Sequence, residues 1–310
     1  MTAVPLRVSI MPDAVSAYEQ AVTGGGGVLV GTGDEPEVLI WSRHGAPDVL
    51  ASTVTELQSI RWVQLPAAGV EDFFRSGAVK SREDVVWTSA KGAYAEPVAE
   101  HAHALVLALL RQLPERLRAK TWGQQAGTSL HRKRVLIVGG GGIGKELARL
   151  LTVYSTATTV IRRRPLPIPH VQRVLTMEHL HRELPDAEVV VLAAALTPET
   201  YGMFSEVEFA LMNPRAVLVN VARGGLVVTD HLVDALESGR IAGAAVDVTD
   251  PEPLPNGHPL WSLDNAIVTP HTADTIEMIV PLLAKRIEEN LIRFATGQQL
   301  VGTINRAEGY

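Results

Sequence analysis

Three glycines near the middle of the chain have the spacing that can bind a dinucleotide. Gly139, Gly141 and Gly144 form a G-x-G-x-x-G pattern in "VLIVGGGGIGKELARLL". The pattern follows an apolar strand-like run and opens a helix-like run, which is the context that the motif requires. Gly139 would allow a tight turn, Gly141 would let a pyrophosphate approach the backbone, and Gly144 would let helix and sheet pack closely. The sequence therefore predicts a dinucleotide site, with a flexible turn as the alternative.

A cluster of arginines follows the next strand-like run. In "TTVIRRRPLP", Arg162 stands where a dinucleotide fold commonly has an Asp or Glu, about 20 residues beyond the glycines. A carboxylate there would repel a 2′-phosphate, whereas Arg162 and Arg163 can donate charge-assisted hydrogen bonds to one. We therefore expect NADP(H) to be preferred over NAD(H). The alternative is a solvated arginine loop, and Arg164, next to Pro165, can simply be solvated.

Composition indicates a globular protein of about two domains. The chain has 310 residues, of which 46% are hydrophobic and 20% charged, and its net charge is −6. A chain of this length usually divides into domains of roughly 100–200 residues. The acidic balance argues against nucleic-acid and anionic-membrane binding, and the absence of cysteine excludes disulfides and cysteine-ligated metals. Because we recognise neither convergent metal ligands nor a membrane-spanning run, we expect no metal and a cytoplasmic location.

Two alternating series of strands and helices would position these groups. The first series has four strand-like runs, at 6–11, 37–42, 61–66 and 85–90. The second has six, at 134–140, 157–162, 187–195, 216–222, 243–248 and 266–271. Alternation with helix-like segments predicts parallel β-α units, and six strands make a complete dinucleotide-type sheet. A second glycine run, at 23–33, opens no helix, and we interpret it as a loop.

The predicted fold class is α/β with two doubly wound parallel-sheet domains. A Rossmann dinucleotide domain at 96–281 would be inserted in a flavodoxin-like substrate domain made of 1–95 and 282–310. An apolar helical segment at 96–120 would bridge the domains, and an amphipathic helix at 281–297 would return to the first one. Ligands collect in crevices of such folds, so the site is expected in the cleft between the domains.

Three further stretches give the chain a family resemblance. Together with the glycine loop, "NVARGGLVVTDHLVDAL", "DVTDPEPLPNGHPLW" and "VTPHTAD" resemble the D-isomer-specific 2-hydroxyacid dehydrogenase family, in this order. "WVQLPAAGVEDF" and "GAYAEPVAEHAHALVLALL" look like its glyoxylate/hydroxypyruvate reductase branch. The resemblance covers nearly the whole chain. It implies an oxidoreductase that transfers hydride between NADPH and a small 2-keto acid to give a D-2-hydroxy acid.

The resemblance assigns the active site to Arg223, Glu252 and His271. The chemistry also calls for these residue types, because negative charge grows on the keto oxygen and the substrate carboxylate needs a cation. His271 would donate a proton, Glu252 would hold it protonated, and Arg223 would bind the carboxylate. Taken singly, each residue has an ordinary explanation as a cap or a solvated side chain. We interpret the other histidines, including His101 and His103, as core or surface residues.

The resemblance implies further contacts outside these three residues. The additional cofactor contacts would come from Gly142, Ile143, Leu196, Ala222 and Asp247. Asp247 would accept a hydrogen bond from the nicotinamide amide, with a helix or turn cap as the alternative. The substrate would meet Arg223, Trp41 and the backbone N–H groups of Ala68 and Gly69, although Trp41 can equally be a core residue. Ala195 replaces a usual proline, so the nicotinamide-side loop can have another shape, but we expect the chemistry to survive. Glu71 replaces a common aspartate, which changes the side-chain support and leaves the N–H groups around Ala68 and Gly69 free to bind a carboxylate.

The apolar helical stretch Val98–Leu110 predicts a homodimer. It looks too hydrophobic to face water, and the resembled family dimerises through this region. A dinucleotide-binding regulator on the same fold is the alternative function, because fold alone does not separate the two. The presence of Arg223, Glu252 and His271 and the lack of basic extensions favour the enzyme. Which 2-keto acid it would take is not encoded in a readable pattern.

Overall fold

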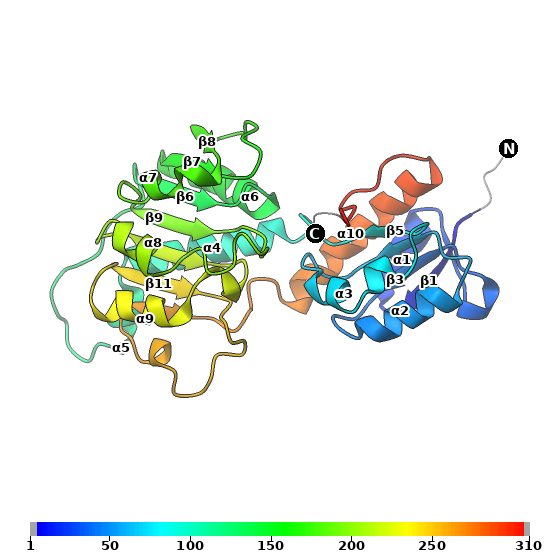
Figure 1. The fold of residues 1–310 in the computed structure, drawn as a ribbon, viewed down its shortest axis with the longest axis horizontal. Helices are drawn as coiled ribbons and strands as arrows, with labels where there is room; N and C mark the ends of the chain where they lie inside the picture. The colour runs from blue at the N-terminus through cyan, green and yellow to red at the C-terminus, as the bar shows by residue number, and fades with distance from the viewer. Residues whose placement is uncertain (1–4, 307–310) are drawn as a thin grey trace. The chain divides into compact units, whose positions relative to one another are not determined.

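The computed structural model describes residues 5–306, which form two compact units. The first unit comprises the described residues up to Tyr94 and those from Thr275 onward, and the second is Ala95–Asp274 (Figure 1). The chain therefore returns to the first unit just before helix α10 (Ile276–Ala295). The sequence analysis placed this boundary inside the helix, at 281–282. The reason is that α10 is one continuous helix that packs along α1 (Ser16–Gly24) of the first unit. The cleft expected between the domains stays a prediction.

The first unit is built on a five-stranded sheet whose neighbouring strands are all parallel. Its strand order is β2-β1-β3-β4-β5. This is the order of a flavodoxin-like sheet, the fold predicted for this unit, although the sequence analysis expected four strands and missed β2. The strands are β1 (Arg7–Met11), β2 (Val28–Leu29), β3 (Val38–Trp41), β4 (Trp62–Gln64) and β5 (Val86–Thr88). The glycine run at 23–33 opens no α-helix, and the edge strand β2 within it has only two residues.

Apolar residues of the first sheet pack under short helices. These helices are α2 (Pro47–Glu56), α3 (Glu71–Arg75), η1 (Thr32–Asp34) and η2 (Ala78–Lys80), in addition to α1 and α10. The core contains the buried side chains Leu39, Trp41, Leu50, Val63, Phe73 and Trp87. Strand residues with apolar side chains on both faces are what a sheet covered by helices requires.

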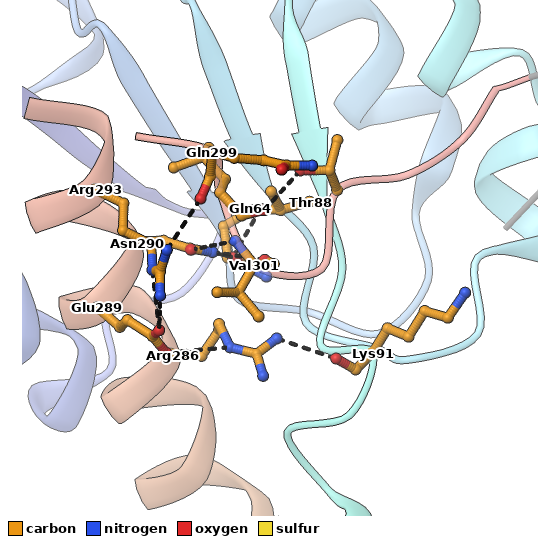
Figure 2. Close-up of polar contacts among 11 residues, drawn as sticks. Gln64, Thr88, Lys91, Arg286, Glu289, Asn290, Arg293, Gln299 and Val301 are labelled. Carbon is orange, nitrogen blue, oxygen red and sulfur yellow. Dashed lines mark hydrogen bonds and ion pairs between the residues drawn. The ribbon is translucent and has the colours of Figure 1, made fainter. Parts of the chain in front are cut away.

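A buried polar network attaches the C-terminal segment to the first sheet (Figure 2). The Asn290 side chain of α10 donates to Val301 O (2.9 Å) and to Gln64 Oε1 (3.3 Å), and accepts from Val301 N (2.8 Å). The Thr88 hydroxyl donates to the same Gln64 oxygen at 2.8 Å. All three side chains are fully buried. Because buried polar groups are costly when unpaired, this network fixes α10 and its following segment against β4 and β5.

We expect Asn290→Ala to destabilise the protein by about 2–4 kcal/mol, since it removes three hydrogen bonds and leaves buried partners unpaired. The midpoint of urea unfolding measures the effect. Gln298→Ala, an exposed position on the same segment, is the control and should leave the midpoint unchanged. Equal midpoints for both variants would show that the network does not hold the segment.

The second unit is built on a seven-stranded parallel sheet with the order β12-β11-β10-β9-β6-β7-β8. Its strands are β6 (Arg134–Val138), β7 (Ala157–Ile161), β8 (Arg173–Leu175), β9 (Val189–Leu192), β10 (Val217–Asn220), β11 (Gly243–Val246) and β12 (Ala266–Val268). The reversal of order at β6 and β9 is that of a Rossmann sheet, so the predicted fold class is confirmed. β8 was not among the six expected strands, because this three-residue edge strand has no buried residue to mark it.

Helix α4 (Ala95–Leu110) explains the most apolar stretch of the chain. It buries Val98, Ala102, Val106 and Leu109 and packs against α6, β10, β11 and β12 of its own unit. Its hydrophobicity therefore does not by itself require a partner subunit, contrary to the reasoning from the sequence. The expected helix at 96–120 is two helices, because Gln112 adopts φ 53° and α5 (Leu113–Arg118) starts anew with Pro114 in its first turn.

The remaining helices of the second unit are short. They are α6 (Gly142–Leu151), α7 (Leu180–Glu183), α8 (Glu206–Leu211), α9 (Thr229–Glu237), η3 (Thr152–Tyr154), η4 (Met177–His179), η5 (Gly224–Leu226) and η6 (Pro259–Trp261). Within residues 5–306, no helix has the length and apolar character needed to cross a membrane.

Candidate active site

The glycine loop lies where the strand order of the second sheet reverses. β6 pairs with β7 on one side and with β9 on the other, and Gly139 directly follows β6. Gly139 has φ 119°, and a Cβ on it would lie 2.2 Å from the carbonyl oxygen of Ala193, just after β9. A Cβ on Gly144 would lie 2.0 Å from the carbonyl oxygen of Gly139. Two close backbone contacts therefore require glycine at these positions, as the motif predicts.

The first turn of α6 fits an anionic group. Gly141 precedes the helix, and a Cβ on it would meet no atom within 4 Å, so its backbone faces open space. The first N–H groups of a helix, here beginning with Gly142 and Ile143, have no partner within the helix and carry a partial positive charge. This loop can therefore hold the pyrophosphate of a dinucleotide.

Arg162 lies beside the glycine loop because β7 is the neighbour of β6. The Gly139 N–H donates to Ile161 O at 2.8 Å, and the Arg162 side chain is half-buried. Arg163 and Arg164 are exposed. The pKa of the nearby Glu199 carboxyl is lowered, first by a hydrogen bond from Thr197, with a smaller contribution from the positive charge of Arg163. The arginines therefore differ in their surroundings, and Arg162 packs against Gly140 of the loop.

The three residues assigned to catalysis follow three adjacent strands. Arg223 comes shortly after β10, Glu252 follows β11, and His271 comes shortly after β12. These strands are parallel neighbours in the order β12-β11-β10. Because the carboxyl ends of parallel strands meet at one edge of a sheet, residues that are 48 positions apart in the chain (271 − 223) are brought to the same edge.

His271 and Glu252 form a direct pair. The distance between His271 Nδ1 and Glu252 Oε1 is 2.6 Å, and the side chains are 45% and 43% exposed. A carboxylate next to Nδ1 favours a proton on that nitrogen and directs the other ring nitrogen, Nε2, away from it. His271 has φ 49°, and its backbone N–H donates to Asp247 O at 2.8 Å. The pair can therefore transfer a proton through Nε2.

Arg223 is positioned by backbone contacts that the sequence analysis did not single out. The fully buried Asn220 donates to Arg223 O (2.9 Å) and accepts from Ala222 N (3.1 Å). A Cβ on Gly224 would lie 1.9 Å from the carbonyl oxygen of Thr249, which precedes Glu252. This close approach joins the loops after β10 and β11. The bare Gly224 allows this approach, while Asn220 holds the backbone on either side of Arg223 within its own loop.

Asp247 fixes the loop that carries His271. Its carboxylate is 2% exposed and accepts hydrogen bonds from the Thr269 hydroxyl (2.6 Å), Thr272 N (2.9 Å) and Ala273 N (3.1 Å). Burial alone would raise the pKa of this carboxyl, but hydrogen bonds from His101, Thr269 and the two N–H groups lower it to about 2. Asp247 therefore stays charged and acts here as the turn cap that the sequence analysis kept as an alternative. Its contact with a nicotinamide stays a prediction.

His101 contacts this anchor, which the sequence analysis missed. Its Nε2 atom is 3.1 Å from Thr269 Oγ1 and 3.4 Å from Asp247 Oδ1. The partners lie as far as 168 positions apart in the chain, so no local pattern could reveal the contact. His103 differs, because burial lowers its pKa and its Nε2 atom has no hydrogen-bond partner within residues 5–306. Both histidines are half-buried, so both fit the interpretation as structural residues, but only His101 is linked to the Asp247 anchor.

The other residues assigned to the second unit have varied surroundings. Ala222 is buried, and Leu196 is half-buried against Gly225, where a Cβ would lie 3.3 Å from its methyl groups. Ala195, which stands in the place of a usual proline, uses its carbonyl oxygen to accept from Thr200 Oγ1 at 2.8 Å. Throughout the described part of the chain, no group of three or more His, Asp and Glu could hold a metal ion.

The candidate substrate residues of the first unit lie in and after its sheet. Trp41 ends β3, is fully buried in the core and donates to Gly45 O at 3.2 Å, which favours the core role. Ala68 and Gly69 follow β4, and their N–H groups donate to no acceptor within residues 5–306. Glu71 opens helix α3. The substrate contacts of these residues stay predictions.

Contacts from the first unit also support the loops after β4 and β5. The Tyr94 hydroxyl donates to Pro66 O, and Ala90 N donates to Ala67 O at 2.9 Å. Arg286 of α10 donates to Lys91 O at 3.1 Å (Figure 2). Burial lowers the pKa of the Arg286 guanidinium, which the nearby Glu289 carboxylate partly offsets. The first two contacts tie the backbone just before Ala68 to the loop after β5.

Comparisons with known proteins agree with this geometry. Residues 103–273 match the family model described as D-isomer specific 2-hydroxyacid dehydrogenase, NAD binding domain. A Corynebacterium melassecola protein named "Uncharacterized protein in proB 3′region" is 38% identical over 259 residues, covering 82% of this chain and 84% of its own. Mouse glyoxylate reductase/hydroxypyruvate reductase is 30% identical over 262 residues, covering 82% of this chain and 76% of its own.

A solved structure extends the match over the whole fold. The D-isomer specific 2-hydroxyacid dehydrogenase from Xanthobacter autotrophicus Py2, in complex with NADPH and MES, has a TM-score of 0.84 and 26% identity. The alignment covers 99% of this chain and 100% of that chain. The family model spans more than half of this chain, and it includes Arg223, Glu252 and His271. The chain therefore belongs to the D-isomer-specific 2-hydroxyacid dehydrogenase family of NAD(P)-dependent oxidoreductases.

Proposed function

We propose that this enzyme reduces a small 2-keto acid of the glyoxylate or hydroxypyruvate type to a D-2-hydroxy acid, with NADPH as the preferred reductant. The observation that carries the proposal is the His271–Glu252 pair, 2.6 Å apart, at the same edge of the sheet as the glycine loop. The name of the mouse relative supports the substrate class, and the NADPH complex of the Xanthobacter enzyme supports the cofactor.

Each of these residues has its own role in the reduction of the carbonyl group. A reduced nicotinamide, when bound, supplies hydride to the keto carbon. His271 Nε2 then gives its proton to the keto oxygen, where negative charge develops, and Glu252 stabilises the protonated ring through Nδ1. Arg223 binds the substrate carboxylate, which needs a planar cation with paired donors. The overall change adds one hydride and one proton to the carbonyl group.

We also propose that the N–H groups of Ala68 and Gly69 bind the substrate carboxylate. Their support is that they donate to no acceptor in the described residues and that hydrogen bonds brace the loop around them. The contact itself uses backbone donors, so it does not require the aspartate that Glu71 replaces. A substrate role of Trp41 is the weaker proposal, because its ring is fully buried. The cytoplasmic location expected from the sequence stays a prediction.

His271→Ala should lower kcat for glyoxylate or hydroxypyruvate by roughly 10²–10⁴-fold, the range that general acid catalysis supplies. Glu252→Gln should lower it less, because the proton donor remains. Loss of NADPH absorbance gives the rates, and His258→Ala, in the loop after Glu252, is the matched control. Near-full activity of His271→Ala would refute the assigned donor. A wild-type protein that binds NADPH but reduces no 2-keto acid would favour the dinucleotide-binding regulator.

The arginines after β7 predict the choice of cofactor. We expect wild type to prefer NADPH over NADH by about 10–100-fold in kcat/KM, since one or two charge-assisted hydrogen bonds reach the 2′-phosphate and solvent weakens them. Arg162→Asp should erase or invert that preference. Arg164→Asp makes the same charge change two residues away and should alter it far less. A wild type that uses both cofactors equally would mean that the arginines are a solvated turn.

We also propose a homodimer, on support other than the apolarity of α4, which packing within its own unit accounts for. The support is now the exposed apolar surface after α4, where Leu117 is 82% and Trp122 97% exposed. Exposed apolar residues of this size favour association. Light scattering at micromolar concentration should give about twice the 33.4 kDa of one chain, and a double change of Leu117 and Trp122 to Lys should give the single-chain mass. A wild-type mass near 33.4 kDa would contradict the dimer.

A further inference from the structure

Gly140 has no role in the glycine motif, yet this chain has glycine there. It occupies the variable second position of G-x-G-x-x-G. Its backbone φ lies outside the left-handed region that favours glycine, unlike that of Gly139. Neither the motif nor the backbone conformation therefore explains the missing side chain. The explanation must come from what surrounds the residue.

Two side chains occupy the space that a Cβ of residue 140 would take. That Cβ would lie 2.8 Å from Arg162 Cδ, 3.1 Å from Arg162 Nε and 3.0 Å from Ile168 Cδ1. Carbon atoms normally approach to about 3.5–4.0 Å, so any larger residue would displace both side chains. All three atoms belong to side chains rather than to the backbone. The Arg162 chain therefore lies directly against the bare Cα of the loop.

The stem of Arg162, its aliphatic part, is packed, whereas its guanidinium is open to a ligand. Its backbone is held by a hydrogen bond from Arg162 N to Leu175 O (2.9 Å), and Ile168 is buried against the same glycine. Within residues 5–306, the Arg162 guanidinium makes no hydrogen bond and no ion pair. Arginine loses considerable rotamer freedom when it binds a ligand, so a stem that is already packed lowers that cost.

We propose that Gly140 is a positioning residue for NADPH selectivity. Its missing side chain lets the Arg162 stem lie across the glycine loop, which holds the guanidinium ready for the 2′-phosphate. This inference rests on the proposed NADPH preference and adds a second residue to it. Gly140→Ala should weaken recognition of the 2′-phosphate without removing any group that touches it. The fold should persist, because the atoms in the way belong to side chains rather than to the backbone.

The test measures binding of two nucleotide fragments by calorimetry, so it does not depend on turnover. Adenosine 2′,5′-bisphosphate carries the 2′-phosphate, and AMP lacks it. Gly140→Ala should weaken binding of the bisphosphate by about 10-fold, as expected when one charge-assisted hydrogen bond is misplaced. The affinity for AMP should stay within about twofold of the wild-type value. In an Arg162→Ala background, Gly140→Ala should cause no further loss, because the residue acts only through Arg162. Thermal unfolding checks that each variant is folded.

The outcomes separate this inference from the proposed cofactor preference. If wild type binds both fragments equally and Arg162→Ala changes neither, the NADPH preference fails and the role of Gly140 fails with it. If Arg162→Ala abolishes a clear preference for the bisphosphate but Gly140→Ala keeps it, only the role of Gly140 is refuted. Equal weakening of both fragments, or a further loss in the Arg162→Ala background, would show damage to the loop itself and also refute it.

Discussion

The candidate active site depends on the hydrogen bonds that the buried carboxylate of Asp247 accepts. Its two oxygens accept hydrogen bonds from Thr269, Thr272 and Ala273, which surround His271 in the chain. A buried charge is costly unless its donors are all in place, so this loop has one favourable conformation. That conformation gives His271 its φ of 49° and directs Nδ1 to Glu252. Contact with His101 connects the same carboxylate to helix α4.

The second constraint is the close approach of backbone segments, which occurs at two places along the carboxyl edge of the second sheet. Gly139 permits the loop after β6 to touch the loop after β9, and Gly224 permits the loop after β10 to touch the loop after β11. Gly140 belongs to the same series, but there the space is filled by Arg162 rather than by backbone. Gly139 and Gly224 therefore allow two pairs of loops to meet, and Gly140 leaves room for the Arg162 side chain.

The sequence predicted the features that depend on local patterns. Apolar strand runs, the glycine motif and the alternation of elements are local, and they led to the correct fold class. The sequence did not predict contacts between distant residues, such as His101 with Thr269 or Asn290 with Gln64, because no periodicity links them. Helix α4 was interpreted as facing a partner for the same reason, since its own unit buries it through segments far along the chain. The three-residue strand β8 was too short and too exposed for a pattern.

The two acidic residues near His271 have environments that suit different tasks. Glu252 is 43% exposed, and an exposed ion pair contributes only about 0–1 kcal/mol to stability, so its pair with His271 cannot hold the loop. Asp247 is sealed from water and holds the loop through hydrogen bonds that do not involve the imidazole. Because the loop is fixed without the imidazole, the proposed proton transfer by His271 does not depend on that ring to hold the loop in place. In the proposed mechanism, this separation of the buried anchor from the proton donor lets an exposed histidine keep a defined geometry.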